Sequence, residues 1–221
     1  MTYDSPLLTA WSQYLPSLLQ GLGESVWLAI ASILIGLPFG FLLCTMVMSH
    51  RRVVSWIGLV IVEIGRGMPA LVILYLVYYG LPRFGITLQN VLSAIIALAW
   101  NYSCYCSEII RAGIQSVPRG QREAGNALGL HSRITFFRII LPQGLRSAIP
   151  GLLGQSILVF QDTSLAYTIA VPELMKQAYS LGGETYQYLR VFVLAGLVYA
   201  MVTLPASWIT RRLERHLGKA Y

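Results

Sequence analysis

The sequence predicts an all-α integral membrane protein with about five transmembrane helices. Of its 221 residues, 56% are hydrophobic and only 11% are charged, whereas about 25% of the residues of a soluble domain are charged. Apolar stretches of about 20 residues, the length that crosses a bilayer, recur along the chain. Five such stretches use about 100 residues, which leaves room for loops and one short accessory helix but not for a separate soluble catalytic domain.

The predicted spans follow one another with short connections. We expect them at residues 25–48, 53–80, 88–110, 148–171 and 191–209, within one transmembrane domain that covers residues 25–210. In the second span, Gly65, Gly67 and Pro69 predict a helix that breaks beside Arg66, because glycine and proline destabilise helix interiors. Such a break frees backbone groups that need a cavity or a ligand to satisfy them.

The two ends of the chain differ from the spans. Residues 1–24 include the stretch 6–22, which is too short and too interrupted by Pro16 to cross the membrane, so we expect an external lead-in or interfacial helix there. Residues 211–221 form a basic tail that we expect on the cytoplasmic side.

The distribution of basic residues predicts the orientation. Residues 1–50 contain no Lys or Arg, and the basic residues then concentrate after the first span, between residues 111 and 146, and in the tail. Because Lys and Arg accumulate in cytoplasmic loops, we expect an external N-terminus and a cytoplasmic C-terminus. The formal net charge of +7 would suggest nucleic acid in a soluble protein. Here the charges lie between spans, so no nucleic-acid partner is expected.

Residues that could support catalysis or bind a metal are few. Cys44, Cys104 and Cys106 lie inside apolar stretches, and three cysteines without a second paired motif give neither a disulfide framework nor a zinc site. We expect them to be buried and reduced. The sequence contains no G-x4-GK[ST] phosphate loop. The chain is therefore predicted not to be an enzyme, with no catalytic residue, no metal site and no cofactor of its own.

The most informative stretch is the cytoplasmic segment at about residues 118–142, between the third and fourth spans. A short helix from about residue 120 to 128, capped by Gly129, is expected there. Small residues on its surface would let it lie in a shallow groove; they are Ala124, Gly125 and Ala127. An amphipathic interfacial helix between two spans is the simpler alternative. The stretch AGNALGL at residues 124–130 also resembles a helix-turn-helix, but flanking spans argue against DNA readout.

This segment resembles the EAA-x3-G-x9-I-x-LP signature of permease subunits of ABC importers. Three blocks in the same order, EIGRGMPALV, YSCYCSEIIRAGIQSVPRGQREA and LPQGLRSAIPGLLGQSILVFQDTSL, resemble the polar amino-acid branch of that family, of histidine, glutamine and glutamate type. The resemblance implies the type I ABC importer permease (MetI-like) fold in the bacterial cytoplasmic (inner) membrane. It also implies a coupling helix that docks on the ATP-hydrolysing subunit through Arg122, Glu123, Ala124, Gly125 and Gly129. Gly125 stands where the signature has a second Ala.

The resemblance also implies the partners and the cargo. Two ATP-binding subunits would hold ATP and Mg, and a homologous or identical permease, an extracytoplasmic solute-binding protein and membrane lipid would complete the assembly. The tract FQDTSL looks most like permeases of glutamate/aspartate importers. From topology alone, the external stretch 172–190, with Glu173, Lys176, Glu184 and Arg190, is the expected docking surface for the binding protein.

Charged and polar groups at membrane depth are costly and are therefore candidates for the solute path. The candidates are Glu63, Arg66, Gln155, Gln161, Asp162, Thr163 and Ser164. Arg66 could bind the carboxylate of an amino acid, and Asp162 or Glu63 its ammonium group. Alternatively, Glu63 with Arg66, and Glu108 with Arg111, form structural pairs at i,i+3, and the hydroxyls bond between helices.

An ion-coupled amino-acid transporter or channel subunit remains the alternative function. It would use the charged groups of the second and fourth spans to couple solute to an ion. The sequence shows no inverted repeat, which a secondary transporter of known architecture would have.

Overall fold

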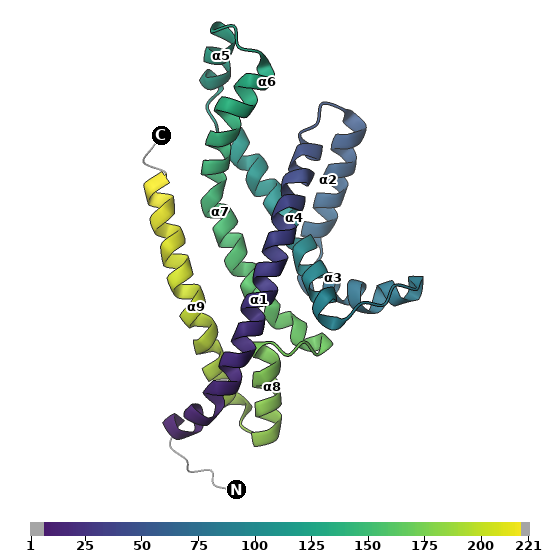
Figure 1. Cartoon of the computed structure of the whole chain (residues 1–221), viewed down its shortest axis with the longest axis vertical. Helices are drawn as coiled ribbons and strands as arrows, with labels where there is room; N and C mark the ends of the chain where they lie inside the picture. Colours follow the sequence, from purple (N-terminus) through teal and green to yellow (C-terminus); the bar gives the residue numbers. More distant parts are fainter. Residues whose placement is uncertain (1–6, 218–221) are drawn as a thin grey trace. The chain divides into compact units, whose positions relative to one another are not determined.

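The structure, a computed structural model, describes residues 7–217, which form helices and no strand (Figure 1). Residues 1–6 of the predicted lead-in and 218–221 of the predicted tail lie outside the described range. In chain order the elements are α1 (Leu7–Val47), α2 (Arg52–Gly67), α3 (Ala70–Tyr75), η1 (Leu76–Gly80), η2 (Leu81–Phe84), α4 (Asn90–Gln115), α5 (Arg119–Ala127), α6 (Ser132–Thr135), η3 (Phe136–Ile140), α7 (Leu141–Asp162), η4 (Thr163–Ile169), α8 (Leu174–Thr185) and α9 (Tyr188–Leu217).

The chain divides into two compact units, each made of three separate stretches. The first unit comprises Met1–Leu34, Pro69–Ala99 and Ile157–Ala206, and the second comprises Ile35–Met68, Trp100–Ser156 and Ser207–Tyr221. The second unit holds the segment that resembles a coupling helix. The first holds the predicted external stretch 172–190.

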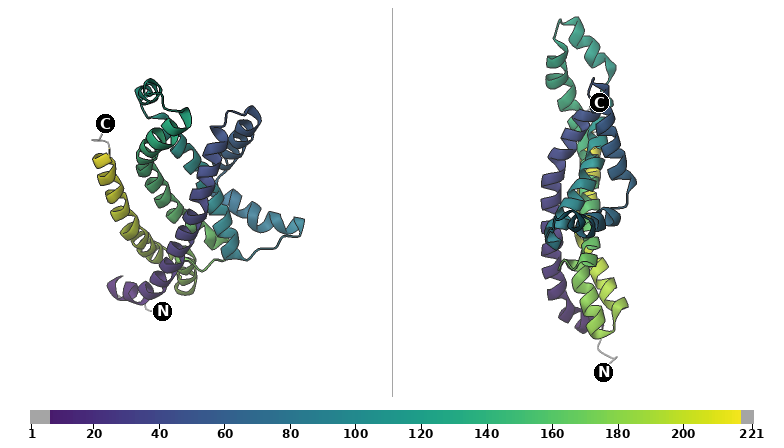
Figure 2. Two further views of the ribbon diagram at one scale, coloured as in Figure 1. Left: turned by 45° about the horizontal axis from the view of Figure 1, so that its top comes forward. Right: turned by 90° about the vertical axis from the view of Figure 1, so that its right-hand side faces the viewer.

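The core of the first unit joins α1, α8 and α9. Leu18 of α1, Leu174 and Ala178 of α8, and Val191 of α9 are fully buried in one cluster. Figures 1 and 2 show α8 alongside the beginning of α9. The predicted external stretch therefore contains a helix anchored by apolar packing.

The core of the second unit joins parts of α1, α2, α4 and η3. One cluster contains Cys44 and Ile110, and a second contains Val62 and Cys104. All three cysteines, Cys106 included, are buried and free of disulfide bonds. The sequence prediction that the cysteines are buried is confirmed.

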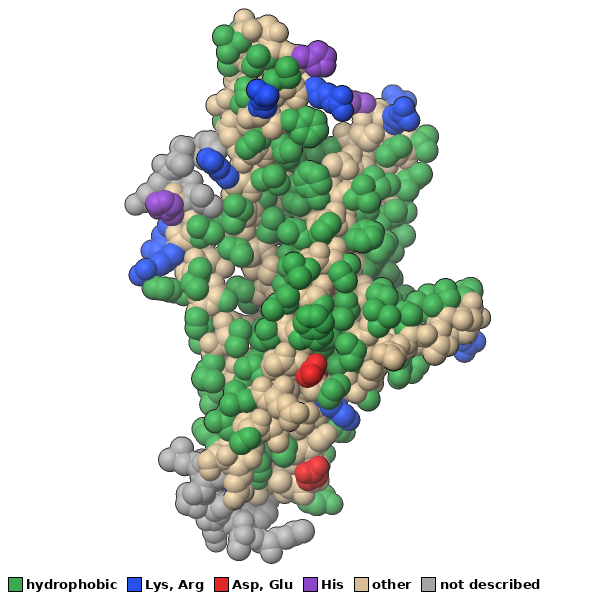
Figure 3. All heavy atoms as spheres, viewed as in Figure 1, with side chains coloured by type: hydrophobic (Ala, Val, Ile, Leu, Met, Phe, Trp, Pro, Cys, Tyr) green, Lys and Arg blue, Asp and Glu red, His purple; other side chains and the backbone are tan. Residues whose placement is uncertain are grey.

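Two helices in the described part of the chain are each long and apolar enough to cross a bilayer, over Trp11–Val47 and Tyr188–His216. The helix α2 and the stretch Ala70–Phe84 meet at a bend of 104°. Counted together as one broken span, they give a third. The predicted break beside Arg66 is confirmed. The helices α4 and α7, of 26 and 22 residues, have the length of a span but carry more polar side chains. The visible faces of the apolar helices are mainly hydrophobic (Figure 3).

Two helix boundaries differ from those expected. Residues 7–24 of the expected lead-in are continuous with the first span in α1, and Pro16 does not interrupt the helix. The predicted fourth span, 148–171, begins earlier and ends as an α-helix at Asp162, after which Thr163–Ile169 form a 3-10 helix. Hydropathy cannot locate this change, because the 3-10 turn is as apolar as the helix before it.

Candidate functional site

The predicted coupling segment forms a helical hairpin of α5 and α6, followed by the π-helix η3 (Figures 1 and 2). The helix α5 starts directly after Pro118, whose fixed φ suits a helix start. Arg122, Glu123 and Ala124 are exposed on it. These side chains are free to meet another protein.

The end of α5 is closed by a complete Schellman motif. Gly129 adopts a left-handed conformation with φ of 67°, which glycine reaches at no steric cost. The amide of Leu130 donates to the carbonyl of Gly125 at 3.0 Å, and the amide of Gly129 donates to the carbonyl of Asn126 at 3.0 Å. These are the two bonds of the motif, and the prediction that Gly129 caps the helix is confirmed.

Gly125 does not lie on the outer surface of α5, and that part of the sequence prediction was wrong. It is buried against Thr135 at the end of α6, where an added Cβ would lie 2.6 Å from the Thr135 Cγ2. The departure from the Ala of the signature therefore has a local cause, because Thr135 fills the space of the missing methyl group. Only Ala124 and Ala127 remain exposed among the three small residues.

Large apolar side chains next to α5 are exposed. Leu128 is 76% exposed, Phe137 is 54% exposed and Ile134 is 45% exposed. Exposed basic residues surround them, namely Arg119, Arg122, Arg133 and Arg138. An apolar patch with a charged rim is typical of a protein interaction surface. The sequence did not single out Leu128 or Phe137 for this role.

The charges of α2 and α4 form one network. Arg66 contacts Glu63 at 3.5 Å and Glu108 at 3.9 Å. Glu108 also binds Arg111 through two hydrogen bonds of 2.9 and 2.6 Å. The two predicted i,i+3 pairs are therefore present, and Glu108 joins them into a neutral group of two arginines and two glutamates. Pairing of this kind lowers the cost of charge at membrane depth.

The helix break beside Arg66 is stabilised by two side chains of α4. The Asn101 Nδ2 donates to the carbonyl of Gly65 at 3.1 Å, and the Tyr105 hydroxyl donates to the carbonyl of Arg66 at 3.2 Å. The Arg66 guanidinium also lies 5.7 Å from the centre of the Tyr105 ring. These two freed carbonyls are thus satisfied by the protein itself. The buried Arg66 Nε has no hydrogen-bond partner among the described residues.

The other candidate path residues lie near the end of α7. Gln155 is buried in the second unit, and the exposed Gln161 belongs to the first. Asp162 is half-buried, and its carboxylate makes no hydrogen bond or ion pair with any described residue. The Thr163 hydroxyl donates to the carbonyl of Phe160 at 2.7 Å, within its own turn. Ser164 is half-buried beside it.

Glu173 is buried, so it cannot belong to the docking surface that the sequence suggested. As the N-cap of α8 it accepts the amides of Met175 and Lys176, both at 2.7 Å. It also accepts the hydroxyls of Ser25 from α1 at 3.3 Å and Tyr199 from α9 at 3.1 Å. Burial raises the pKa of this carboxyl from 4.5 to about 7, although these donors oppose the shift.

The turn between α8 and α9 presents exposed apolar side chains. Tyr186 is 77% exposed and Leu189 is 78% exposed. Tyr186 has φ of 57°, a left-handed conformation that is unfavourable for a residue with a Cβ. Strain of this kind persists where the rest of the structure or a function requires it. The rings of Tyr179 and Tyr188, one on each side of the turn in sequence, contact each other with their centres 5.8 Å apart.

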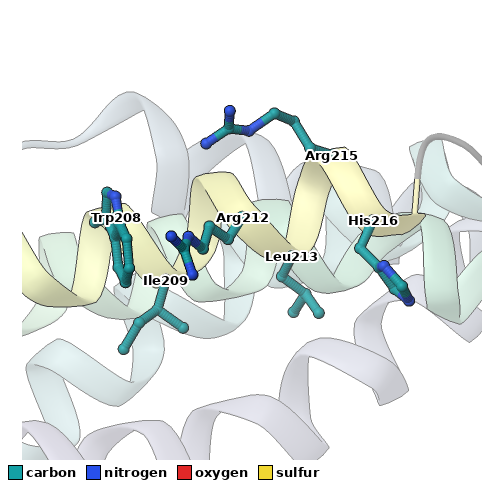
Figure 4. A pocket seen from close by; sticks show the side chains of 6 residues that line it. All are labelled: Trp208, Ile209, Arg212, Leu213, Arg215 and His216. Atoms are coloured by element: carbon teal, nitrogen blue, oxygen red, sulfur yellow. The ribbon is translucent and has the colours of Figure 1, made fainter.

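An open hollow lies at the end of α9 and is lined by that helix alone (Figure 4). Its lining residues are Trp208, Ile209, Arg212, Leu213, Arg215 and His216. None of the predicted solute-path residues contributes to it. It is therefore not the site at which the sequence placed the solute.

Comparison with solved structures identifies the fold. The chain superimposes with a TM-score of 0.91 on a structure described as an amino acid ABC transporter with histidines, with 30% sequence identity over 96% of this chain and 99% of the other. An inward-facing MetNI methionine ABC transporter gives a TM-score of 0.67 at 19% identity, over 89% of this chain and 96% of the other. The predicted fold class, a type I importer permease, is confirmed.

Comparison of sequences identifies the family. The L-cystine transport system permease protein TcyB of Bacillus subtilis (strain 168) is 38% identical over 92% of this chain and 89% of its own length. The glutamate/aspartate import permease protein GltK of Escherichia coli O157:H7 is 36% identical over 93% of this chain and 96% of its own length. The arginine transport system permease protein ArtQ of Bacillus subtilis (strain 168) is 33% identical over 92% of this chain and 93% of its own length.

A family model described as "Binding-protein-dependent transport system inner membrane component" matches residues 32–219. That range contains the α5 hairpin, the charge network and the break in the second span. Proteins of this family are components of membrane transport systems rather than enzymes. The chain therefore belongs to the family of inner membrane components of binding-protein-dependent transport systems.

Proposed function

We propose that this chain is the permease subunit of an ATP-driven ABC importer for polar amino acids. The observation that carries the proposal is the capped helix α5, with an exposed Glu123 and Ala124, at the position of the family's coupling helix. The chain lacks a phosphate loop of its own, so an ATPase must be a separate subunit. The amino-acid permeases among its relatives support the class of cargo.

The proposed complex contains two ATP-binding subunits, which hold ATP and Mg, and a second permease that is identical or homologous. The ATPase would contact Arg122, Glu123 and Ala124, together with the apolar Leu128 and Phe137. Gly125 and Gly129 would act indirectly, by fixing the shape of the hairpin. Basic side chains around the patch favour an acidic groove on the ATPase.

The proposed orientation has an external N-terminus and a cytoplasmic C-terminus in the bacterial inner membrane. Because α7 is one continuous helix, its two ends lie on opposite sides of the membrane if it spans. The α5 hairpin precedes α7 and is cytoplasmic in this orientation, while α8 follows it and is external. The arginines at the end of α9 agree with a cytoplasmic C-terminus.

The extracytoplasmic binding protein is proposed to dock at the α8–α9 turn. The exposed and strained Tyr186, with Leu189, would be its apolar contact. Glu184, which is exposed, and Arg190 would form the polar rim of that contact. Glu173 would contribute only by holding α8 in place.

The residues that we propose for the solute path are Glu63, Arg66 and Gln155 of the second unit, and Gln161, Asp162, Thr163 and Ser164 of the first. The unpaired carboxylate of Asp162 suits an ammonium group. Arg66 already faces Glu63 and Glu108, so a solute carboxylate would have to compete with them. Glutamate and aspartate are the proposed cargo, from the tract FQDTSL and the glutamate/aspartate permease among the relatives.

Competition for uptake tests the cargo. Membrane vesicles that contain the complete complex would be given a labelled mixture of amino acids and an excess of unlabelled glutamate, aspartate, glutamine, arginine or histidine. Competition by glutamate and aspartate alone supports an acidic cargo. Failure of acidic amino acids to compete, with strong competition by arginine or glutamine, rejects that choice and leaves the permease function standing.

An ion-coupled transporter or channel subunit is the alternative. It predicts uptake driven by an ion gradient in the absence of any ATPase. The network of Arg66, Glu63, Glu108 and Arg111 is neutral, and each of its charged groups is paired with an opposite charge. That arrangement favours a structural role for the network and weakens the ion-coupled alternative.

A further inference from the structure

The cytoplasmic end of α9 has a surface that the proposed transport mechanism does not use. Residues of its last turns line a wide-open surface hollow of about 640 Å³. We call Trp208, Arg212 and Arg215 the arginine stripe. They stand at positions i, i+4 and i+7 and therefore share one face of the helix. Ile209 and Leu213 form the apolar side of the same hollow.

Arg212 is held by Trp208. Its guanidinium carbon lies 3.7 Å from the centre of the indole ring, which is close stacking. A stacked guanidinium uses its flat face for the ring and keeps its N–H edge free. No hydrogen bond or ion pair joins that edge to a described residue. It can therefore bind an oxyanion through two parallel hydrogen bonds.

Arg215 presents a second free edge. Its Nε donates to the carbonyl of Arg211 at 3.3 Å, and the side chain extends back along the helix toward the turn of Arg212 (Figure 4). The terminal nitrogens of Arg215 form no ion pair with a described residue. The three arginines of 208–216 outnumber the acid Glu214, which leaves a formal charge of +2 with His neutral.

The arginine stripe lies at the depth of lipid headgroups. The apolar stretch Tyr188–His216 has 29 residues, or about 43 Å of helix, whereas the hydrocarbon layer is about 30 Å thick. Arginine at the centre of that layer is costly, so the arginine end of the helix lies outside it. Trp208 then stands at the membrane interface, where tryptophan is enriched.

We propose that this hollow binds the headgroup of an anionic phospholipid. The lipid phosphate would accept hydrogen bonds from Arg212 and Arg215, and the glycerol and first methylene groups would contact Ile209 and Leu213. A free phosphate ion offers the same oxygens, but it has no apolar part to cover these two side chains. The apolar residues of the lining therefore favour the lipid over the free ion. The proposal is independent of which solute the chain transports.

The test measures lipid retention by the purified full-length chain in detergent. Native mass spectrometry would follow titration with phosphatidylglycerol, and with phosphatidylcholine as the zwitterionic reference. In the double variant R212Q/R215Q, the affinity for phosphatidylglycerol should fall by about fivefold for each arginine removed, with phosphatidylcholine retention unchanged. The matched control is R51Q/R52Q, which removes the same charge from another exposed pair and should retain the affinity of the unmodified chain.

A third variant and a competitor sharpen the outcome. R212K/R215K keeps the charge but loses the planar donor edge, so it should bind phosphatidylglycerol more weakly than the unmodified chain, and excess inorganic phosphate should not displace the lipid. Equal loss in both glutamine variants would mean general charge attraction and would overturn the proposal. Displacement by inorganic phosphate would assign the hollow to a free anion. Full lipid retention by R212Q/R215Q would overturn the proposal.

Discussion

The side chain of Thr135 occupies the space in which a Cβ of residue 125 would lie. A Cβ built on Gly125 would be 2.6 Å from the Thr135 Cγ2 and 2.7 Å from its Oγ1. The buried hydroxyl of Thr135 has no hydrogen-bond partner among the described residues. Gly125 and Thr135 therefore form a matched pair that sets how closely α5 approaches α6.

Replacing Gly125 by Ala should loosen the hairpin. Overpacking costs about 1–3 kcal/mol and outweighs the gain in helix propensity of about 1 kcal/mol. Hydrogen exchange of the Leu130 amide, which closes the Schellman motif, should be faster in this variant. Thr135→Ala alone should exchange at nearly the original rate, because it removes an unpaired hydroxyl.

The double variant Gly125→Ala/Thr135→Ala is the control for this pair. In this variant the Cβ atoms of residues 125 and 135 would lie about 3.3 Å apart, a contact that a small shift can relieve. Hydrogen exchange of the Leu130 amide should therefore return to its original slow rate. If the Leu130 amide exchanges as fast in the double variant as in Gly125→Ala, the two residues are not coupled. The contact with Thr135 would then not be the reason that position 125 requires glycine.

Gly129 should tolerate only residues that adopt a left-handed conformation. Gly129→Val places a branched side chain at φ of 67° and should cost about 1–3 kcal/mol, whereas Asn is tolerated there. We expect Gly129→Val to reduce ATP-driven uptake about tenfold or more, and Gly129→Asn to keep most of it. Equal uptake by the two variants would show that the cap does not matter for coupling.

Glu108 should contribute more to stability than Glu63. Its side chain is 17% exposed and faces both Arg66 and Arg111, whereas that of Glu63 is 61% exposed. Glu108→Gln should therefore destabilise the protein by about 1–3 kcal/mol, and Glu63→Gln by less than about 0.5 kcal/mol. Thermal unfolding in detergent compares the two variants. A larger loss for Glu63→Gln would contradict the observed network.

Glu173 should make the protein less stable as the pH rises. Its pKa is raised from 4.5 to about 7 in the folded state. Between pH 4.5 and 7, the Glu173 carboxyl therefore keeps its proton in the folded protein and loses it in the unfolded chain. The stability contributed by protonation is complete below pH 4.5 and is lost as the pH rises through about 7. The expected loss is about 3 kcal/mol in total.

The variant Glu173→Gln isolates this effect, because glutamine resembles the protonated carboxyl group and does not titrate. The difference in melting temperature between the two proteins should change between pH 4.5 and 7 and stay constant above about 7. A constant difference over the whole range, or a difference of opposite slope, would show that Glu173 does not carry the raised pKa.

Tyr186 should matter for docking and not for folding. Tyr186→Gly relieves the left-handed backbone at φ of 57°, so stability should stay the same or rise by up to about 1 kcal/mol. Stimulation of the ATPase by the binding protein should nevertheless fall severalfold. Ala170→Gly is the matched control, because it relieves a φ of 61° without removing a large side chain. Unchanged stimulation in Tyr186→Gly would place the docking surface elsewhere.

The sequence predicted those features that depend on local chemistry. Gly129 was recognised as a cap because the residue type and its place after a helical segment determine the conformation. The break beside Arg66 followed from two glycines and a proline within five residues. The two i,i+3 ion pairs followed from helical periodicity alone.

Features that depend on contacts between distant segments could not be predicted. The link from Arg66 to Glu108 joins two helices, and no spacing rule brings them together. Thr135 explains Gly125 only once α6 is folded back on α5. Glu173 looked like an external charge because its partners Ser25 and Tyr199 lie 148 and 26 residues away.

Uptake into proteoliposomes tests most directly whether this chain is coupled to an ATPase. The proteoliposomes would contain this permease, its partner permease and the ATPase, with the binding protein and a labelled amino acid outside. Uptake should require ATP inside and should stop when the ATPase is omitted or replaced by a variant that cannot hydrolyse ATP, even with a proton or sodium gradient present. Uptake that continues without ATP hydrolysis, driven by the ion gradient, would contradict the proposal that this chain is coupled to an ATPase through α5.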